Sequence, residues 1–407
     1  MTESVLREYA SLIANVGGHV QSGQEVRIIA ELDQPGFIRM LAEECYKAGA
    51  AKVEVEWQDQ PLTRLANEYQ SLETLSRTEA WEEERMRHRV KTLPVRLIIL
   101  SEDPDGLSGI DQEKAAKASQ ARYKVYKPYR DAIDNRHQWC IAAVPGQAWA
   151  HKMFPDDAPD VAVEKLWRAI LHAARADGDP VAAWKAHNAD LAARSAYLND
   201  LQIDTLEYSA SNGTHFTVGL MPESRWGAGS ETTFSGVVYN PNIPSEEVFT
   251  TPRRDTAEGI VYATRPLSYQ GELIEDFWIR FEKGKAVEVH AEKNEALLRH
   301  MISMDEGAAY LGECALVPYD SPIRESGLLF YNTLFDENAA CHLALGEGFP
   351  ECVADFKDRT LEECRALGVN DSIIHEDFMI GCKDLCITAH TRDGRTVPIF
   401  RDGNWAF

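Results

Sequence analysis

Near its start, the chain reads EVRIIA at residues 25–30, PGFIRMLAEECYKA at 35–48 and KVEVEW at 52–57. The first segment is a short apolar run, the second repeats its apolar residues at helical spacing, and the third alternates strictly between apolar and polar residues. This order predicts a βαβ unit. Because a crossover helix joins parallel strands, the unit predicts a parallel sheet that is covered by helices.

The rest of the first half continues this alternation. Strands are predicted at 95–100 and 139–144, and the helical stretches between them lie at 78–92, 111–120 and 126–133. The turn after the first strand reads ELDQPG, and neither GxGxxG nor GxxxxGK[ST] occurs there. We therefore do not expect this half to bind a nucleotide through such a loop.

The pattern changes near residue 200. Helical stretches at 162–176 and 180–198 precede a region of strands and turns, in which Phe277, Ile279 and Phe281 share one face and Val287 and Val289 return after a turn at 283–284. A helix is predicted at 292–303, and a late hairpin turns at Asp393-Gly394 with a two-residue loop.

The predicted class is therefore α/β. An N-terminal parallel-sheet domain (1–200) is expected to act as scaffold, as cavity wall and as a candidate for dimer contacts. A mixed α+β domain (201–407) is expected to follow it.

The composition excludes several classes of partner. The chain has 65 acidic and 42 basic side chains and a formal charge of −23, so nucleic acid is not an expected partner. No apolar run reaches the roughly 18 residues of a membrane span, and the first residues lack the apolar core of a signal peptide. The eight cysteines include no CxxC pair. We expect a cytoplasmic protein with reduced thiols.

Four segments of the second half combine carboxylates or imidazoles with apolar neighbours. Neither HExxH nor GxSxG is present. The four segments are PNIPSEEVFTTP (241–252), YLGECALVP (310–318), NTLFDENAACHLALGEGF (332–349) and IIHEDFMIG (373–381).

Glu313 is the most informative residue of these segments, because a lone carboxylate in an apolar strand costs several kcal/mol unless it is paired or metal-bound. In the HxD pattern, alternation places His375 and Asp377 on one face. Taken singly, the pair Glu246-Glu247 is typical of a solvated turn, and His342 is typical of a core residue. Together, the four segments favour a metal site for zinc, cobalt, manganese or iron.

The same segments resemble the motifs of the aminopeptidase T, AmpS and PepS family of dinuclear metallo-aminopeptidases, in the same order and at nearly the same spacing. The resemblance implies a cytoplasmic homodimer that removes N-terminal residues from peptides with broad specificity. It also implies two divalent ions per chain (Zn, Co, Mn or Mg) and makes residues 201–407 the metal-binding, catalytic metallopeptidase domain. The ligands carried over by motif are Glu247, Glu313, Glu337, His342, His375 and Asp377.

Two divalent cations a few ångströms apart need several carboxylates, and a shared carboxylate with a shared water is an economical arrangement. Glu313 is predicted to bridge. Glu246 and Glu313 both remain candidates for the general base. The family commonly has a tyrosine where this chain has Phe349, so another hydroxyl, from Tyr310 or Tyr331, could replace it as a donor to the oxyanion.

Two other functions compete with the peptidase. A mononuclear Fe(II) ring-cleaving dioxygenase on a related fold needs two histidines and one carboxylate, which His342, His375 and Asp377 could supply. A non-catalytic metal-binding protein is the other alternative. The dioxygenase has no need of Glu247 and Glu313, so the number of carboxylates favours the peptidase.

Overall fold

The computed structural model describes residues 1–407 as two compact units. Unit 1 comprises residues 1–186 and 230–244, and unit 2 comprises residues 187–229 and 245–407. The boundary between the two units therefore lies within the helix that was predicted at 180–198. Residues 230–244 belong to unit 1 again. The functional roles assigned to 1–200 and 201–407 remain predictions. No helix is long and apolar enough to cross a lipid bilayer.

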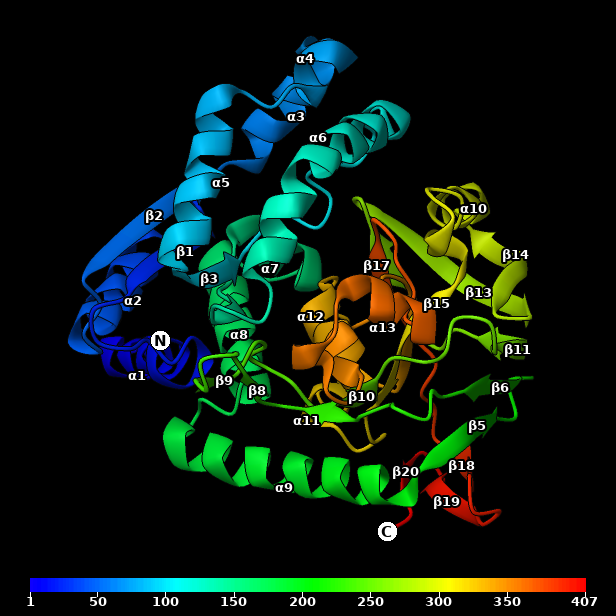
Figure 1. Ribbon diagram of the computed structural model, residues 1–407. Coiled ribbons are helices and arrows are strands. Elements are labelled where there is room, and N and C mark those ends of the chain that lie inside the picture. The colour runs from blue at the N-terminus through cyan, green and yellow to red at the C-terminus, as the bar shows by residue number, and fades with distance from the viewer. The chain divides into compact units, whose positions relative to one another are not determined.

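Unit 1 is built on the predicted parallel sheet, with strand order β2-β1-β3-β4 (Figure 1). The strands are β1 (Glu25–Glu31), β2 (Lys52–Gln58), β3 (Val95–Leu100) and β4 (Trp139–Ala143). β1 pairs in parallel with both β2 and β3, and β3 pairs in parallel with β4. Each strand is connected to the next strand along the chain through one or more helices, as the crossover rule requires. A short antiparallel pair, β8 (Glu231–Thr232) with β9 (Val238–Tyr239), completes the strands of the unit.

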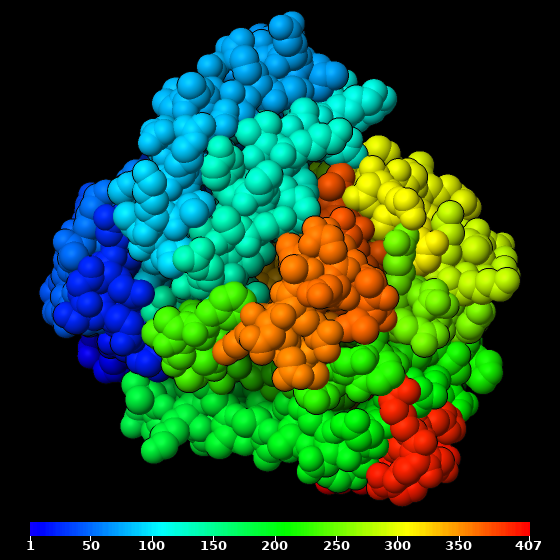
Figure 2. Space-filling view, in the orientation of Figure 1, coloured from blue at the N-terminus to red at the C-terminus, as the bar shows by residue number.

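The predicted helices of unit 1 form with one difference, and the structure adds four that were not predicted, at Glu3–Leu12, Gln60–Tyr69, Leu72–Ser76 and Gln147–Met153. The helices of the unit are α1 (Glu3–Leu12), the π-helical turn Ile13–Gly17, α2 (Pro35–Lys47), α3 (Gln60–Tyr69), α4 (Leu72–Ser76), α5 (Ala80–Thr92), α6 (Gln112–Ile133), α7 (Gln147–Met153) and α8 (Pro159–Ala173). The two helices predicted between 111 and 133 form the single helix α6, because residues 121–125 contain no helix breaker. Figure 2 shows α6 (cyan) beside the light-blue segment that contains α5, and Arg122 of α6 donates to Glu82 of α5.

His137, between α6 and β4, is expected to make unit 1 less stable in acid. Its Nδ1 lies 2.9 Å from the carbonyl oxygen of Ile133, and its buried Nε2 has no partner. Burial lowers the pKa of His137 to about 4, and the nearby Arg96 adds to this effect. The unfolded chain, with an ordinary pKa near 6.5, takes up the proton first as the pH falls, so stability is complete above about pH 6.5 and declines towards pH 4.

This decline is expected to reach about 3 kcal/mol by pH 4, from the difference between the two pKa values. Urea unfolding of the wild type and of His137→Asn between pH 7 and 4 measures it. The variant should show a smaller loss over that range, whereas the exposed control His151→Asn should follow the wild type. Parallel curves for the wild type and His137→Asn would contradict the assignment.

Unit 2 contains two antiparallel sheets, which follow the long helix α9 (Pro180–Leu201). The larger sheet has the order β12-β13-β11-β6-β5-β18-β19-β20, with β14 also paired to β13. Its strands are β5 (Ile203–Ser209), β6 (His215–Gly219), β11 (Glu258–Tyr262), β12 (Leu267–Tyr269), β13 (Glu272–Glu282), β14 (Lys285–Lys293), β18 (Cys386–Thr391), β19 (Thr396–Arg401) and β20 (Asn404–Trp405).

The smaller sheet has the order β17-β16-β15-β10-β7. Its strands are β7 (Gly227–Ala228), β10 (Val248–Thr250), β15 (Leu311–Leu316), β16 (His342–Gly346) and β17 (His375–Met379). The two sheets share one apolar core: the rings of Phe277 in β13 and Phe378 in β17 lie 6.0 Å apart, and both are buried. Short helices connect the strands, among them α10 (Glu295–Met301), α11 (Pro322–Glu325), α12 (Thr333–Asp336) and α13 (Leu361–Leu367).

Both predicted hairpins form, and each differs in one detail. In the first, a β-bulge between Arg280 and Phe281 places Ala286 opposite Phe281. Val289 is therefore buried and Val287 is 45% exposed, so only Val289 of these two valines faces the core.

The late hairpin turns through three residues, 392–394, and not through two. The N–H of Thr391 donates to the carbonyl of Arg395, and Gly394 has a φ of +86°. That left-handed conformation favours glycine and accommodates the extra residue of a three-residue loop.

Candidate metal centre

The predicted site residues lie on neighbouring strands of the smaller sheet. Glu247 directly precedes β10, Glu313 lies in β15, His342 begins β16, and His375 and Asp377 lie in β17. The strand order places these four strands side by side. Segments that are separated by up to 130 residues in sequence therefore meet at one place in the sheet.

The register of the sheet explains why the side chains share a face. Glu313 is opposite Ala344, and Ala344 is opposite Asp377, so the two acids flank a small residue in one row. His342 precedes Ala344 by two residues, and His375 precedes Asp377 by two, which places all four functional side chains on the same face. The methyl group of Ala344 leaves room between the carboxylates.

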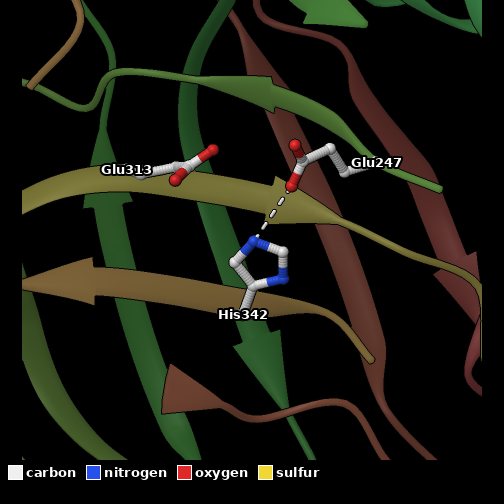
Figure 3. Close-up of side chains that lie close together, drawn as sticks. All are labelled: Glu247, Glu313 and His342. Carbon is white, nitrogen blue, oxygen red and sulfur yellow. Dashed lines mark ion pairs between the residues drawn. The ribbon is translucent and has the colours of Figure 1, made fainter. Parts of the chain in front are cut away.

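The first group of candidate ligands consists of Glu247, Glu313 and His342, whose nearest ligand atoms all lie within 4.8 Å of one another. Figure 3 shows His342 pointing towards Glu247, with Glu313 beside them. His342 Nε2 lies 3.1 Å from Glu247 Oε2. Its Nδ1 lies 3.0 Å from the carbonyl oxygen of Ala340, so a donor bond there leaves Nε2 as the free acceptor that a metal requires.

The second group consists of Glu313, His375 and Asp377, again within 4.8 Å. His375 Nε2 lies 3.1 Å from Glu313 Oε2 and 3.5 Å from Asp377 Oδ1. Its Nδ1 faces the carbonyl oxygen of Glu347 at 2.7 Å, so this imidazole is also oriented by the backbone. Glu313 belongs to both groups.

The electrostatics of the site favour the binding of positive charge. Glu247, Glu313 and Asp377 are all buried. Burial raises the pKa of Glu313 to about 7, although the hydrogen bond to His375 opposes the shift, and the carboxylates of Glu247 and Asp377 raise it further. Burial also raises the pKa of Glu337 well above its usual range, and repulsion by Asp377 adds to this shift.

The pKa values of the histidines are raised as well, which means that the site favours their charged form. Burial tends to lower the pKa of His342, but its bond to Glu247 and the surrounding carboxylates outweigh burial and hold the pKa well above its ordinary value. The buried Oδ1 of Asp377 accepts no hydrogen bond. Divalent cations such as zinc, cobalt and manganese bind carboxylate oxygens and imidazole nitrogens in proteins. These residues therefore fit a metal site.

The comparisons with known proteins agree with this chemistry. Residues 2–405 match the family described as Thermophilic metalloprotease (M29). The chain belongs to this family. It is 42% identical over 407 residues to Aminopeptidase 2 of Geobacillus stearothermophilus, covering 100% of this chain and 98% of the relative. It is 41% identical over 403 residues to Aminopeptidase T of Thermus thermophilus, covering 98% of each chain.

A solved structure confirms the fold of this M29 member. Wild-type AmpT from Thermus thermophilus matches with a TM-score of 0.90 and 39% identity, over 100% of both chains. The resemblance inferred from the four motifs and the predicted α/β class are both confirmed.

The remaining predicted residues of the M29 chain lie around the two groups. Glu246 and Glu337 are buried, and the carboxylate of neither belongs to the groups defined above. The ring of Phe349 lies 4.8 Å from the His375 ring and 5.4 Å from the Phe249 ring, so it packs against a candidate ligand. The guanidinium of Arg254 stacks over the ring of Tyr310 at 4.2 Å.

Asn338 is a structural partner that the sequence reasoning missed. Its fully buried amide accepts from the N–H of Glu246 at 2.6 Å and donates to Leu334 O at 2.8 Å and Glu337 Oε1 at 3.3 Å. The segment before β10 and the segment before β16 are thus held together by one side chain. Its position next to Glu337 was the only signal available, because an uncharged amide gives no motif of its own.

His187 of α9 was also missed. Its Nε2 lies 2.6 Å from the carbonyl oxygen of Ser245 and 4.0 Å from Glu246 Oε2. Since α9 and this segment are 58 residues apart in sequence, no local pattern connects them.

Proposed function

We propose that this chain, a metal-dependent aminopeptidase, holds two divalent cations in the two buried groups that share Glu313. The M29 family and the full-length aminopeptidase relatives establish the class of enzyme. The observation that supports two ions is that Glu313 lies within 4.8 Å of the other members of both groups, with a different histidine in each.

The proposed ligands are Glu247 and His342 on one side, His375 and Asp377 on the other, and Glu313 between them. Glu337 is proposed as an additional ligand, since its buried carboxylate is destabilised by Asp377 and Glu247. The mixture of carboxylates and imidazoles suits Zn, Co, Mn or Mg. When bound, such ions would polarise the peptide carbonyl and make water a better nucleophile near neutral pH.

The side chains of the protein supply the proton transfer and the positioning. Glu246 and Glu313 remain the two candidate bases. Asn338 fixes the backbone of Glu246, and His187 lies near its carboxylate, so Glu246 is held in place without belonging to either ligand group. A carboxylate in that position can take up a proton from water and deliver it to the leaving amine.

Peptides with a free N-terminus and a broad range of first residues are the proposed substrates. The cluster of buried carboxylates provides an electrostatic partner for the α-ammonium group, which an internal peptide bond lacks. Selection for the terminal residue would follow from this charge pairing.

We also propose that the enzyme is a cytoplasmic homodimer. Leu62, Leu65 and Tyr69 of α3 occur at helical spacing, and their exposed fractions are 61%, 46% and 77%. An apolar helix face of this kind is typical of a surface that another chain covers. Sedimentation of the wild type and of Leu65→Glu tests it: a dimer that the substitution weakens supports the proposal, and a wild-type monomer contradicts it.

The main experiment removes the metal by dialysis and restores cobalt, zinc, manganese, magnesium or iron one at a time. Bound ions are counted while leucyl, arginyl and aromatic aminoacyl anilides are assayed. Two ions per chain with anilide hydrolysis support the dinuclear proposal. One iron per chain with oxygen uptake and no hydrolysis would overturn it in favour of the dioxygenase.

Phe349→Tyr is expected to preserve or raise kcat. The substitution restores a hydroxyl beside His375, where a donor could stabilise the developing oxyanion, while the ring contact with His375 is kept. Steady-state kinetics with leucyl anilide measure the effect, and Phe249→Tyr is a matched control on the neighbouring ring. A fall in kcat of more than about tenfold with the metal content unchanged would contradict the role of the hydroxyl.

A further inference from the structure

Unit 1 contains a pocket that the peptidase chemistry does not use. It has a volume of about 410 Å³ and lies where the amino ends of β1 and β2 face α5. The side chains that matter for its chemistry are Arg27, Lys52, Trp81, Arg85, His88 and Arg89. All of them belong to unit 1, so the pocket is described by this unit alone.

The helix over this pocket is unusually polar for one that covers a sheet. Trp81, Arg85 and Arg89 recur every four residues, which places them on one face of α5, and all three line the pocket. Met86 is the only buried side chain of the helix. Helices that pack on a sheet ordinarily present an apolar stripe to it. Packing on the sheet therefore does not account for the polar face of α5.

Three guanidinium groups from the lining of the pocket share a single acceptor atom. Arg27 Nε, Arg85 Nη2 and Arg89 Nη2 donate to Oε2 of Glu56 at 2.7, 2.9 and 3.0 Å. Each guanidinium has five N–H donors, so most of the donors in this cluster have no hydrogen-bond acceptor in the protein. The side chains of Arg27 and Arg89 are only 14% and 17% exposed, yet none of their nitrogens is buried without a partner, so the remaining donors can be reached from solvent.

The other acids around the pocket are paired nearer the surface. Glu54 lies 3.2 Å from Lys52, Glu84 lies 2.8 Å from Arg87, and Glu25 lies 3.4 Å from His88. Glu54 also lies 3.7 Å from Arg85. The inner cluster therefore has three cations, one anion that all three contact and a second anion beside Arg85. Burial lowers the pKa of Arg89, repulsion from Arg27 lowers it further, and the carboxylate of Glu56 opposes the shift.

We propose that this pocket binds a compact multivalent oxyanion, of the phosphate or polycarboxylate class. Guanidinium groups form paired, charge-assisted bonds with both kinds of oxyanion, and Arg27, Arg85 and Arg89 all line this pocket and have unused donors. Trp81, 60% exposed with the Arg85 guanidinium 5.8 Å from its ring, offers a flat surface for the rest of the ligand.

The position of the pocket explains why no motif revealed it. Doubly wound sheets bind phosphates at the carboxyl ends of their strands, through a glycine-rich loop. This pocket lies at the amino ends, and its donors are side chains from β1 and α5.

The test is calorimetric titration of the metal-loaded full chain with sodium pyrophosphate and, separately, with sodium citrate, at constant ionic strength. Saturable binding of either probe, weakened at least about tenfold by Arg89→Met, is expected. The matched control is Arg87→Met, on the same helix with the same change of charge, because Arg87 pairs with Glu83 and Glu84 and does not line the pocket. It should bind like the wild type.

The choice of probes separates the two sources of the oxyanion: pyrophosphate binding alone identifies a phosphorylated ligand, and citrate binding alone identifies a polycarboxylate. Binding of neither probe overturns the proposal, as does equal weakening by Arg87→Met and Arg89→Met.

Hydrogen exchange of the wild type locates the anion without any variant. Protection of residues 80–92 by the probe supports the pocket. If the exchange in α5 is unchanged and Glu313→Gln abolishes binding, the anion lies at the metal centre and the proposal is wrong. Because Arg89→Met leaves every proposed metal ligand in place, the metal count and anilide hydrolysis of that variant report on the proposed peptidase mechanism independently.

Discussion

Glu313→Gln is expected to lower kcat by about a thousandfold or more, which corresponds to about 4 kcal/mol of transition-state stabilisation, and to lower the number of bound ions. Glu313 is the only member common to the two ligand groups, so its loss affects both. An amide has nearly the same shape as the carboxylate but lacks the charge that would balance two divalent cations. The carboxylate is buried in an apolar strand, so water cannot replace it easily.

The measurement combines steady-state kinetics with metal analysis of the purified variant. Glu292→Gln, on the exposed surface of the same unit, is the matched control and should behave like the wild type. Glu246→Gln provides the contrast that identifies the base: if Glu246 moves the proton, this variant keeps its metal and loses kcat. Full activity of Glu313→Gln with two ions bound would exclude the bridging role.

Arg265→Met is expected to reduce the free energy of unfolding of unit 2 by about 3–5 kcal/mol, because it leaves a buried carboxylate without its cation. Arg265 Nη2 lies 2.8 Å from Asp336 Oδ1, and both side chains are buried. Burial raises the pKa of Asp336, and Arg265 opposes this shift by stabilising the charged form. Asp336 also accepts from the N–H groups of Phe330 and Asn332, so it shapes the segment that leads to His342.

Urea unfolding at neutral pH measures this loss. Arg280→Met is the control, because Arg280 pairs with Glu282 and Glu288 on the exposed surface and such pairs contribute about 0–1 kcal/mol. The double variant Arg265→Met/Asp336→Asn should recover part of the stability, since the amide no longer carries an unpaired charge. A single variant as stable as the wild type would show that Asp336 is compensated in another way.

The four strands of the parallel sheet and the helix between the first two could be predicted from the sequence because their signals are local. The alternation of residues 52–57 and the helical spacing of 35–48 report directly on which side chains are buried. The hairpins were less predictable in detail. The bulge that exposes Val287 depends on how β14 fits the buried face of β13, and this fit is decided by the packing of two strands.

The sequence by itself determined the βαβ order, the lone carboxylate of Glu313 and the HxD pair, since each of these depends on neighbours within a few residues. Only the tertiary structure decided that Glu313 lies in one row with Ala344 and Asp377, that Asn338 joins two segments 92 residues apart, and that Arg27, Arg85 and Arg89 share Glu56. The physical reason is that burial leaves a periodic record along the chain, whereas strand order and register bring distant side chains together without leaving such a record.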